Sequence, residues 1–175
     1  MTDILQAAAH RRSIRAYTKE PISEENLKEI LQTGLLSPSG RAIRPLEFIV
    51  VRSKETLQKL SKCRTAGSGI LADADAAIVV LACTDRQDVW VEDCSIAMSL
   101  MHLCADSLGV GSCWIQGRLR TAADGSSTED YLRSIFEFPE NYALEAILSL
   151  GMPGQTLPAR SPEDADMSKV HWEEW

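Results

Sequence analysis

The sequence predicts one domain that combines α-helices and β-strands. Three observations lead to this prediction: several segments carry apolar residues at helical spacing, short β-branched runs lie between them, and no low-complexity block or linker divides the chain. The 175 residues match the length of one ordinary domain, which buries about two-thirds of the surface of its unfolded chain. Strands that alternate with helices normally suggest a parallel sheet.

The N-terminal quarter is expected to hold two helices and a loop. Residues 2–10 predict a short helix capped by Thr2. Ser23 can cap a second helix, in which leucine and isoleucine recur every three or four positions. Pro38 and Gly40 then end this helix and begin a polar loop.

The middle of the chain predicts two strands and two helices. Residues 47–52 read as a strand, and Ser53 can cap the helix that follows. The run AAIVVLAC (76–83) suits a strand covered on both faces. Residues 91–108 form the longest helical pattern, and Gly109 is well placed to end it. The broad apolar face of this helix is expected to contain Ile96, Ala97, Leu100, Leu103 and Cys104.

Two further strands and one helix are expected before the C-terminal segment. Residues 112–116 and 144–150 read as strands, and Ser127 begins a helix over 127–137. The last 25 residues are rich in proline and glycine. We therefore expect them to be extended rather than folded on themselves.

Composition excludes several classes of protein. The net charge of −7 and the pI near 5.0 make general binding to nucleic acid or to an anionic membrane unfavourable. No apolar run approaches the roughly 20 residues that span a bilayer. The start, MTDILQAAAHRRS, lacks a basic stretch followed by an apolar core, so no signal peptide is expected. These features predict a soluble, cytoplasmic protein.

Neither the cysteines nor the histidines form a recognisable metal or disulfide pattern. We expect the cysteines to be reduced core residues, although a catalytic Cys–His pair stays open. The histidines are isolated, so no metal site is expected. The residues are Cys63, Cys83, Cys94, Cys104, Cys113, His10, His102 and His171.

Common nucleotide-binding motifs are missing from their expected places. Gly109-Val110-Gly111 follows a helix and precedes a strand, which is the wrong context for a dinucleotide-binding turn, and there is no phosphate-binding P-loop pattern. Four polar segments remain without a core role: 11–15, 37–45, 109–117 and 151–160. Taken alone, segment 11–15 is more typical of a solvated cationic patch, 37–45 of a polar turn loop and 151–160 of a surface segment, and 109–117 is equally consistent with a helix stop and a buried strand.

Taken together and in this order, these segments resemble the nitroreductase family of FMN-dependent oxidoreductases. The matching stretches are RRSIRAY, SPSGRAIRPLEFIVV, EDCSIAMSLMHLCADSLGVGSCWIQG and GMPG…PAR, from about residue 10 to residue 160. The resemblance implies an α+β fold with three α-β-α layers and a central mixed, mainly antiparallel sheet around a long core helix. It also implies an FMN-binding domain over 1–160 and a tail, 161–175, that packs on the partner subunit.

The resemblance further implies which residues hold FMN. The R-x-S-x-[RK] segment and the arginine of the tail bind the phosphate in the family, and arginine suits a dianionic phosphate. The loop approaches the flavin from the other subunit, and two amides after the long helix face flavin N5 and O4, where they favour the reduced form. The corresponding residues are Arg11, Arg12, Ser13, Arg15, Arg160, Pro38, Ser39, Gly40, Gln116 and Gly117.

The loop departs from the family pattern S-P-S-x-x-N-x-Q-P-W. Ala42 replaces the asparagine, Arg44 the glutamine and Leu46 the tryptophan. Ala42 cannot supply the side-chain hydrogen bond to the flavin, a loss of roughly 1 kcal/mol that weakens cofactor binding without abolishing it. Arg41 and Arg44 are expected on the substrate side, where Arg44 adds a positive charge toward the flavin's pyrimidine end or an anionic substrate.

The implied function is a homodimeric, FMN-dependent NAD(P)H oxidoreductase with no metal and with FMN sites at the interface. NADH or NADPH is expected to transfer hydride to flavin N5 and leave before a nitroaromatic, quinone or similar acceptor binds. Three alternatives stay open. The protein could be a non-catalytic flavin-binding redox sensor, a specialised relative such as a reductive dehalogenase or flavin-cleaving enzyme, or an α/β nucleotide-binding domain without flavin.

Overall fold

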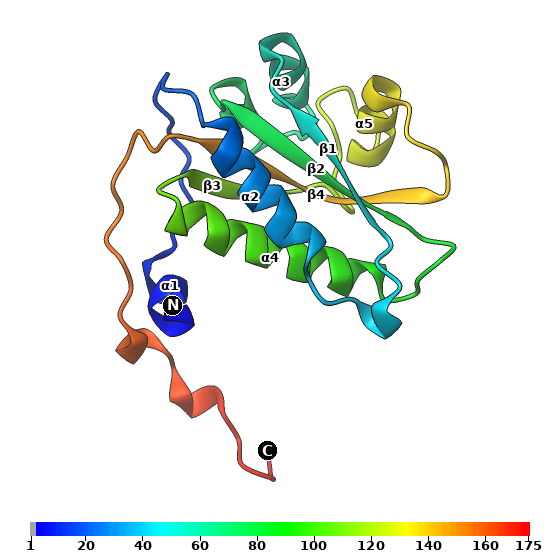
Figure 1. The fold of residues 1–175 in the computed structure, drawn as a ribbon. Coiled ribbons are helices and arrows are strands. Elements are labelled where there is room, and N and C mark those ends of the chain that lie inside the picture. The colour runs from blue at the N-terminus through cyan, green and yellow to red at the C-terminus, as the bar shows by residue number, and fades with distance from the viewer. Residues whose placement is uncertain (1–2) are drawn as a thin grey trace.

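A four-stranded sheet with helices on both faces forms the centre of the computed structural model, which describes residues 3–175 (Figure 1). The helices are α1 (Ile4–His10), α2 (Glu24–Leu35), α3 (Lys54–Leu60), α4 (Trp90–Ser107) and α5 (Thr128–Phe136). The strands are β1 (Leu46–Val51), β2 (Ala76–Cys83), β3 (Gly111–Gln116) and β4 (Tyr142–Gly151). Short 3₁₀ turns lie at Gly40–Ala42, Gly69–Ala72, Pro162–Asp164 and Met167–Lys169.

The strands lie in the order β1-β2-β4-β3, and every neighbouring pair is antiparallel. A single parallel bridge between Ser13 and Ser112 adds to the outer edge of β3. The mainly antiparallel α+β fold is therefore confirmed. The parallel sheet suggested by alternating elements is wrong, because α3 connects β1 to an adjacent strand that runs back beside it.

Two apolar cores cover the two faces of the sheet. Helices α2 and α4 lie on one face and α3 and α5 on the other, which gives the expected three layers (Figure 1). All eight residues of β2 are buried, as a strand covered on both faces requires. The outer edges of β1 and β3 are consequently the parts of the sheet where a ligand can approach backbone groups.

The buried face of α4 differs from the predicted one. Its buried apolar residues are Cys94, Ala97, Met98, Met101 and Ala105. Of the residues predicted there, only Ala97 is fully buried, and Ile96 is 40% exposed. Apolar side chains surround this helix, so periodicity alone does not select the face that meets the sheet.

Most of the predicted helix ends are confirmed. Ser23, Ser53 and Ser127 each accept a backbone N–H from three residues ahead, and Gly109 follows α4 with a φ of +72°. Thr2 lies outside the described residues, and the Asp3 side chain caps α1.

The C-terminal segment is extended, as predicted, apart from its two short turns. It leaves β4, passes α1 and ends away from the sheet (Figure 1). Trp172 and Trp175 at its end are fully exposed or nearly so. All five cysteines are free, and Cys104 is the one that is not buried. Among the described residues, no helix is both long and apolar enough to cross a membrane.

Candidate functional site

The basic segment Arg11–Arg15 lies along the outer edge of β3. Ser13 bridges Ser112, and the Ile14 amide donates to the Ser112 carbonyl at 2.9 Å. The approach is close, since a Cβ at Gly111 would lie 2.9 Å from Ile14 Cγ2. Successive side chains of an extended segment point to opposite sides. The bridge therefore determines which basic side chains face the same way.

A hollow of about 400 Å³, the clamp hollow, opens beside this segment. Arg11 and Ser13 contribute to its wall, and residues of α4 and β3 complete it. The lining residues are Ala8, Arg11, Ser13, Ser99, His102, Leu103 and Trp114. None of these side chains is acidic, so an entering anion meets a guanidinium and a hydroxyl without a competing carboxylate.

Arg15 joins Arg11 in the neighbourhood of Cys113. Burial raises the pKa of the Cys113 thiol, and the nearby charges of Arg15 and Arg11 partly offset that rise. Nη1 of Arg15 also donates to the Ser13 carbonyl at 3.3 Å. Arg11 and Ser13, two of the predicted phosphate ligands, therefore line the clamp hollow, and Arg15 lies beside Ser13 without lining it.

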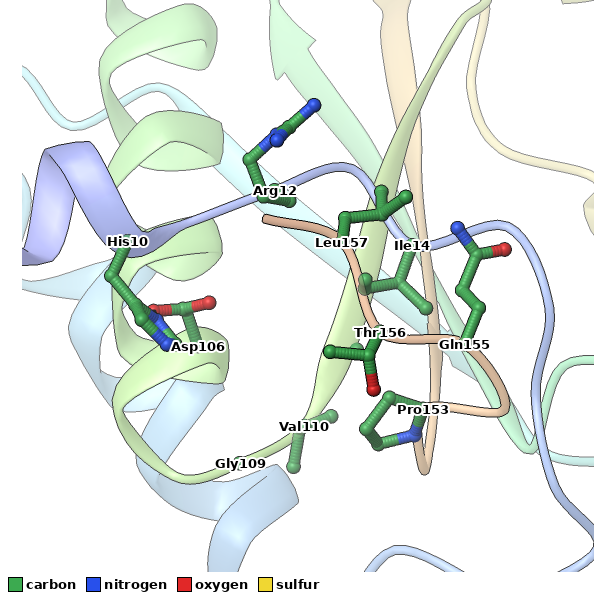
Figure 2. Close-up of a pocket in the computed structure, with 11 residues that line it drawn as sticks. His10, Arg12, Ile14, Asp106, Gly109, Val110, Pro153, Gln155, Thr156 and Leu157 are labelled. Atoms are coloured by element: carbon green, nitrogen blue, oxygen red, sulfur yellow. The ribbon is translucent and has the colours of Figure 1, made fainter. Parts of the chain in front are cut away.

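Arg12 lies at the rim of a different pocket, of about 190 Å³, and its guanidinium points away from the other lining residues (Figure 2). Its guanidinium donates to the Pro158 carbonyl of the C-terminal segment. Figure 2 shows His10 beside Asp106 on the side of this pocket that faces Thr156 and Pro153, and His10 Nδ1 lies 2.7 Å from Asp106 Oδ2. Contrary to expectation, the structure therefore separates the side chain of Arg12 from that of Arg11.

Arg160 lies on the outer side of α1. Its amide donates to the Ala9 carbonyl at 2.9 Å, which fastens the tail to the helix. The residue lines a small hollow with Ala8 and Pro162 and is not among the residues that line the clamp hollow. Within one chain, the structure does not bring Arg160 to Arg11.

His102 supplies a neutral, polar wall to the clamp hollow. The residue is buried, and its Nδ1 lies 2.8 Å from Ser112 Oγ. Burial, with a smaller contribution from Arg11, lowers the pKa of His102 to about 4. The imidazole is therefore uncharged near neutral pH, and the positive charge of the hollow comes from the arginines.

The two residues predicted to present amides to a flavin point in opposite directions. The Gly117 amide donates to the Glu145 carbonyl at 3.1 Å, toward β4. Amide directions alternate along an antiparallel strand, so the Gln116 amide points to the open edge of β3. The prediction is therefore wrong for the Gly117 amide. Gly117 serves close packing instead, because a Cβ there would lie 2.5 Å from Leu144 Cδ2.

The side chain of Gln116 is held by hydrogen bonds to Trp114 and Glu145. Its Oε1 accepts from Trp114 Nε1 at 2.8 Å, and its Nε2 donates to Glu145 Oε1 at 3.3 Å. Glu145 is buried, its other carboxylate oxygen has no hydrogen-bond partner, and burial raises its pKa. This network orients the Gln116 side chain, and the backbone N–H of Gln116 stays directed toward the open edge of β3, where it can meet a ligand.

The loop 37–45 is held rigidly at the N-terminal end of α4. The Gly40 amide donates to the buried Asp93 carboxylate at 2.8 Å, and the Gly40 carbonyl accepts from Gln87 Nε2 at 2.7 Å. Asp93 is nine residues before His102, about 13 Å along the helix. Within one chain, the loop residues Pro38, Ser39 and Gly40 therefore lie well away from the clamp hollow.

The two arginines of this loop differ in their partners. The Arg41 guanidinium donates to Gln87 Oε1 at 2.8 Å and to Asp88, so it stabilises the loop. Arg44 is exposed, and its backbone amide donates to Ser39 Oγ at 2.9 Å. Arg41, Ala42 and Arg44 all have φ between +50° and +55°, a strained arrangement that proteins keep mainly at functional sites.

A second hollow, the arginine hollow, lies beyond the far end of β3 and was not predicted from the sequence. Its volume is about 430 Å³. Arg118 Cζ lies 5.8 Å from the centre of the Trp90 ring. The lining residues are Trp90, Gly117, Arg118, Leu119, Arg120, Ser127, Glu129, Asp130 and Ala143. The sequence offered one signal for this hollow. Arg118 directly follows Gln116 and Gly117, the pair predicted to face the flavin.

The two hollows and the edge between them suit an elongated ligand with an anionic end and a flat polar end. The clamp hollow offers cationic donors, and the free Gln116 amide lies toward the other end of β3. The donor set therefore fits a flavin mononucleotide. Among residues 3–175, no group of three or more His, Cys, Asp or Glu side chains could hold a metal ion.

Comparison with known proteins gives consistent matches across the chain. The model of the Nitroreductase family matches residues 8–64 and 64–152. A protein of Archaeoglobus fulgidus, provisionally named NADH dehydrogenase/NAD(P)H nitroreductase, is 36% identical over the full length of both chains. The structure of an FMN-dependent nitroreductase from Clostridium difficile R20291 has a TM-score of 0.94 at 41% identity, covering 98% of this chain and 99% of that one.

A further structural match includes the cofactor. A provisionally assigned nitroreductase from Desulfovibrio desulfuricans, solved in complex with FMN, has a TM-score of 0.75 at 26% identity. The match covers 92% of this chain and 93% of that one.

Proposed function

This chain belongs to the nitroreductase family, and on that premise we propose that it is an FMN-dependent oxidoreductase with its cofactor along the edge of β3. NADH or NADPH is the reductant, and a nitroaromatic, a quinone or a similar small molecule is the acceptor. The two react in turn at the same site, in a ping-pong sequence. The observation that carries the proposal is the presence of Arg11 and Ser13 in one hollow beside the strand that ends in Gln116, with the Arg15 guanidinium bonded to the Ser13 carbonyl.

Arg11, Ser13 and Arg15 would hold the phosphate of FMN. Charge-assisted hydrogen bonds from guanidinium groups are about twice as strong as neutral ones, and no acidic side chain lines this hollow. His102 stays neutral, so it completes the wall without adding charge. The retention of FMN would therefore depend mainly on the two arginines.

At the other end of β3, the Gln116 amide would face the flavin ring. When bound, FMN supplies the redox chemistry by carrying two electrons and a proton between NAD(P)H and the acceptor. The backbone N–H is a fixed dipole and needs no reorganisation as negative charge develops on the ring. Glu145 and Trp114 hold the Gln116 side chain, so the direction of this amide is set before the ligand arrives.

A homodimer would complete the site. The loop 37–45 and the clamp hollow lie at different positions along α4 of one chain. Two copies that pair with their α4 helices antiparallel would bring Pro38, Ser39 and Gly40 of one copy toward the clamp hollow of the other. Such pairing would also cover Ile96, which α4 exposes, and would give the tail 161–175 a surface on the partner.

An absorption spectrum followed by a turnover assay tests this function. The purified protein should be yellow, should consume NADH or NADPH when a quinone is added, and should have about twice the chain's mass of 19.3 kDa by light scattering. A colourless protein that takes up no FMN would overturn the cofactor assignment. A yellow protein that reduces no quinone or nitroaromatic would indicate a redox sensor, and a flavin-loaded monomer would overturn the shared site.

A further inference from the structure

We propose that the arginine hollow is a subsite for flat aromatic acceptors that carry a negative charge, with Trp90 as the stacking face and Arg118 as the charge receptor. The inference rests on the proposed function, because it places the acceptor next to the flavin end of β3. It assigns to this site a substrate class that neither the loop nor the clamp hollow specifies.

The location of the hollow supports this assignment. Gly117 and Arg118 line it and directly follow Gln116, whose amide faces the open edge. Trp90 enters from the first turn of α4 and Ala143 from β4. With a volume of about 430 Å³, the hollow falls within the range of small-molecule sites. A molecule held here lies beside the predicted reacting end of the flavin.

Arg118 is positioned by its backbone. Its amide donates to the Glu145 carbonyl at 2.9 Å, and the Arg120 amide donates back to the Gly117 carbonyl at 3.2 Å. Leu119, between them, has a φ of +57°. This tight turn holds the Arg118 side chain over the indole of Trp90, at the distance typical of a cation–π contact.

The acidic residues of the hollow already have partners. Glu129 accepts from Arg133 Nη2 at 2.7 Å and from the Leu144 amide at 2.9 Å. Asp130 Oδ2 accepts from Ser127 Oγ at 2.6 Å. Because these carboxylates are engaged elsewhere, they compete less for a guanidinium in the same hollow.

Arg118, in contrast, has unused donors. Within residues 3–175, its guanidinium forms no hydrogen bond or ion pair with another side chain; its contact is the Trp90 ring. Burial raises the pKa of Glu145 and the nearby charge of Arg118 partly offsets that rise, but the two side chains form no ion pair within residues 3–175. A guanidinium with free donors beside an aromatic face suits a planar ring that bears a sulfonate or carboxylate.

The loop arginines are less suited to this role. Arg41 is engaged by Gln87 and Asp88. Arg44 is exposed, and no aromatic ring is stacked with it in the described part of the chain. Arg118 combines a charge and a stacking surface in one place, so we expect it to dominate discrimination between charged and neutral acceptors.

The test uses Arg118→Ala in the flavin-loaded protein, with Lys19→Ala as a control for the loss of one positive charge. Lys19 has an 89% exposed side chain, and its partner Asp73 is also exposed. The probes are a naphthoquinone sulfonate, the corresponding uncharged naphthoquinone, and naphthalene-2-sulfonate, which stacks but cannot be reduced. The two readouts are the KM of each quinone and the Kd of naphthalene-2-sulfonate from calorimetric titration.

We expect Arg118→Ala to raise the KM of the sulfonated quinone about tenfold relative to that of the neutral quinone, as for the loss of one charge-assisted hydrogen bond. The Kd of naphthalene-2-sulfonate should rise by a similar factor. Lys19→Ala should change the ratio of the two KM values less than twofold. Arg118→Lys should recover part of the discrimination, because it keeps the charge but not the planar fork.

Several results would overturn the subsite. An unchanged ratio of KM values in Arg118→Ala, or an equal rise for both quinones, would show that Arg118 does not recognise charge. A KM for NADPH that rises as much as that of the sulfonated quinone would assign the hollow to the reductant. If no quinone is reduced at all, the proposed function fails, and the naphthalene-2-sulfonate titration still decides whether the hollow binds aromatic anions.

Discussion

The clamp hollow and the arginine hollow lie at opposite ends of one strand, yet they balance charge differently. The clamp hollow is lined by Arg11 and a neutral His102, with no acidic residue among its lining side chains. The arginine hollow is lined by Arg118 and Arg120 together with Glu129 and Asp130, whose carboxylates accept from Arg133 and Ser127. A hollow without carboxylates retains an anion strongly, whereas nearby carboxylates, even when bonded to other groups, weaken the attraction and allow the anion to leave. We infer that the first end holds the cofactor and the second exchanges the reactants.

The largest effect is expected when the arginines at the clamp hollow are replaced. Arg11→Ala and Arg15→Ala should each weaken FMN binding by roughly 10- to 100-fold, because each removes a charge-assisted contact. The loss should grow at high salt, where the remaining attraction is screened. The measurement is the ratio of flavin absorbance to protein after gel filtration at two salt concentrations.

Arg12→Ala is the matched control, because this guanidinium contacts Pro158 on the other side of the segment. It should retain clearly more flavin than the Arg11 variant. Equal losses in the two variants would contradict the separation of Arg11 from Arg12. Full flavin in both Arg11→Ala and Arg15→Ala would show that the phosphate binds elsewhere.

A second prediction concerns the neutral imidazole of the clamp hollow. The pKa of His102 is about 4 in the folded protein against 6.5 as its ordinary value, so the unfolded state takes up the proton more readily. The stability is fully present above pH 6.5 and is lost as the pH falls toward 4, by about 3 kcal/mol at most. Denaturant unfolding of the flavin-free protein at pH 7.5 and 4.5 measures it.

His102→Gln keeps a polar side chain that cannot titrate. Its unfolding free energy should fall less than that of the original protein between the two pH values. The same fall in both proteins would mean that other groups cause the acid sensitivity.

A third prediction concerns Glu145, whose carbonyl accepts from the amides of Gly117 and Arg118 at the arginine hollow. Its buried carboxylate has an oxygen without a partner, so Glu145→Gln should raise the unfolding free energy at pH 7.5 by roughly 1 to 2 kcal/mol. Burial raises the pKa of Glu145 in the folded state. The stabilisation should therefore shrink as the pH falls toward 4.5, where the carboxyl is protonated in the original protein as well.

Asp124→Asn is a suitable control, because this fully exposed carboxylate accepts hydrogen bonds from Ser126. It should not stabilise the protein at pH 7.5. A decrease in stability of Glu145→Gln at that pH would show that the ionised carboxylate is needed to hold Gln116.

The smallest expected effect concerns the loop that the proposed dimer brings to the clamp hollow. Ala42 has a φ of +55°, a conformation that asparagine adopts more readily than alanine. Ala42→Asn should stabilise the loop slightly and tighten FMN binding about fivefold, as for one neutral hydrogen bond of roughly 1 kcal/mol. Flavin fluorescence titration of the reconstituted protein measures the change, and weaker binding would argue against the loop's contact with the flavin.

Helix ends and strands could be predicted because they depend on local chemistry. Serine at 23, 53 and 127 caps its helix wherever the chain lies, and the β-branched run 76–83 is apolar on both faces whatever its neighbours are. The face of α4 could not be predicted in the same way. Apolar residues surround that helix, and only the position of the sheet selects Met98 and Met101 over Ile96.

In the candidate site, too, the residue types could be predicted from the sequence and their directions could not. Its residue types and their order identified the nitroreductase resemblance, and the segment 11–15 was singled out from its charge. The sequence did not show which way each side chain or amide points, since these groups alternate in direction from one residue to the next along a strand. The bridge between Ser13 and Ser112 separates Arg11 from Arg12, and the pairing of β3 with β4 separates the Gln116 amide from that of Gly117.

By itself, the sequence determined the serine caps at 23, 53 and 127, the buried strand 76–83 and the family, and it predicted which residues bind a phosphate. The tertiary structure alone decided the antiparallel strand order, the separation of the loop from the clamp hollow, and the meeting of Trp90 with Arg118. The physical reason is the range of the interactions. Capping and burial preference act within a few residues, whereas register and the meeting of distant side chains depend on how whole elements pack together.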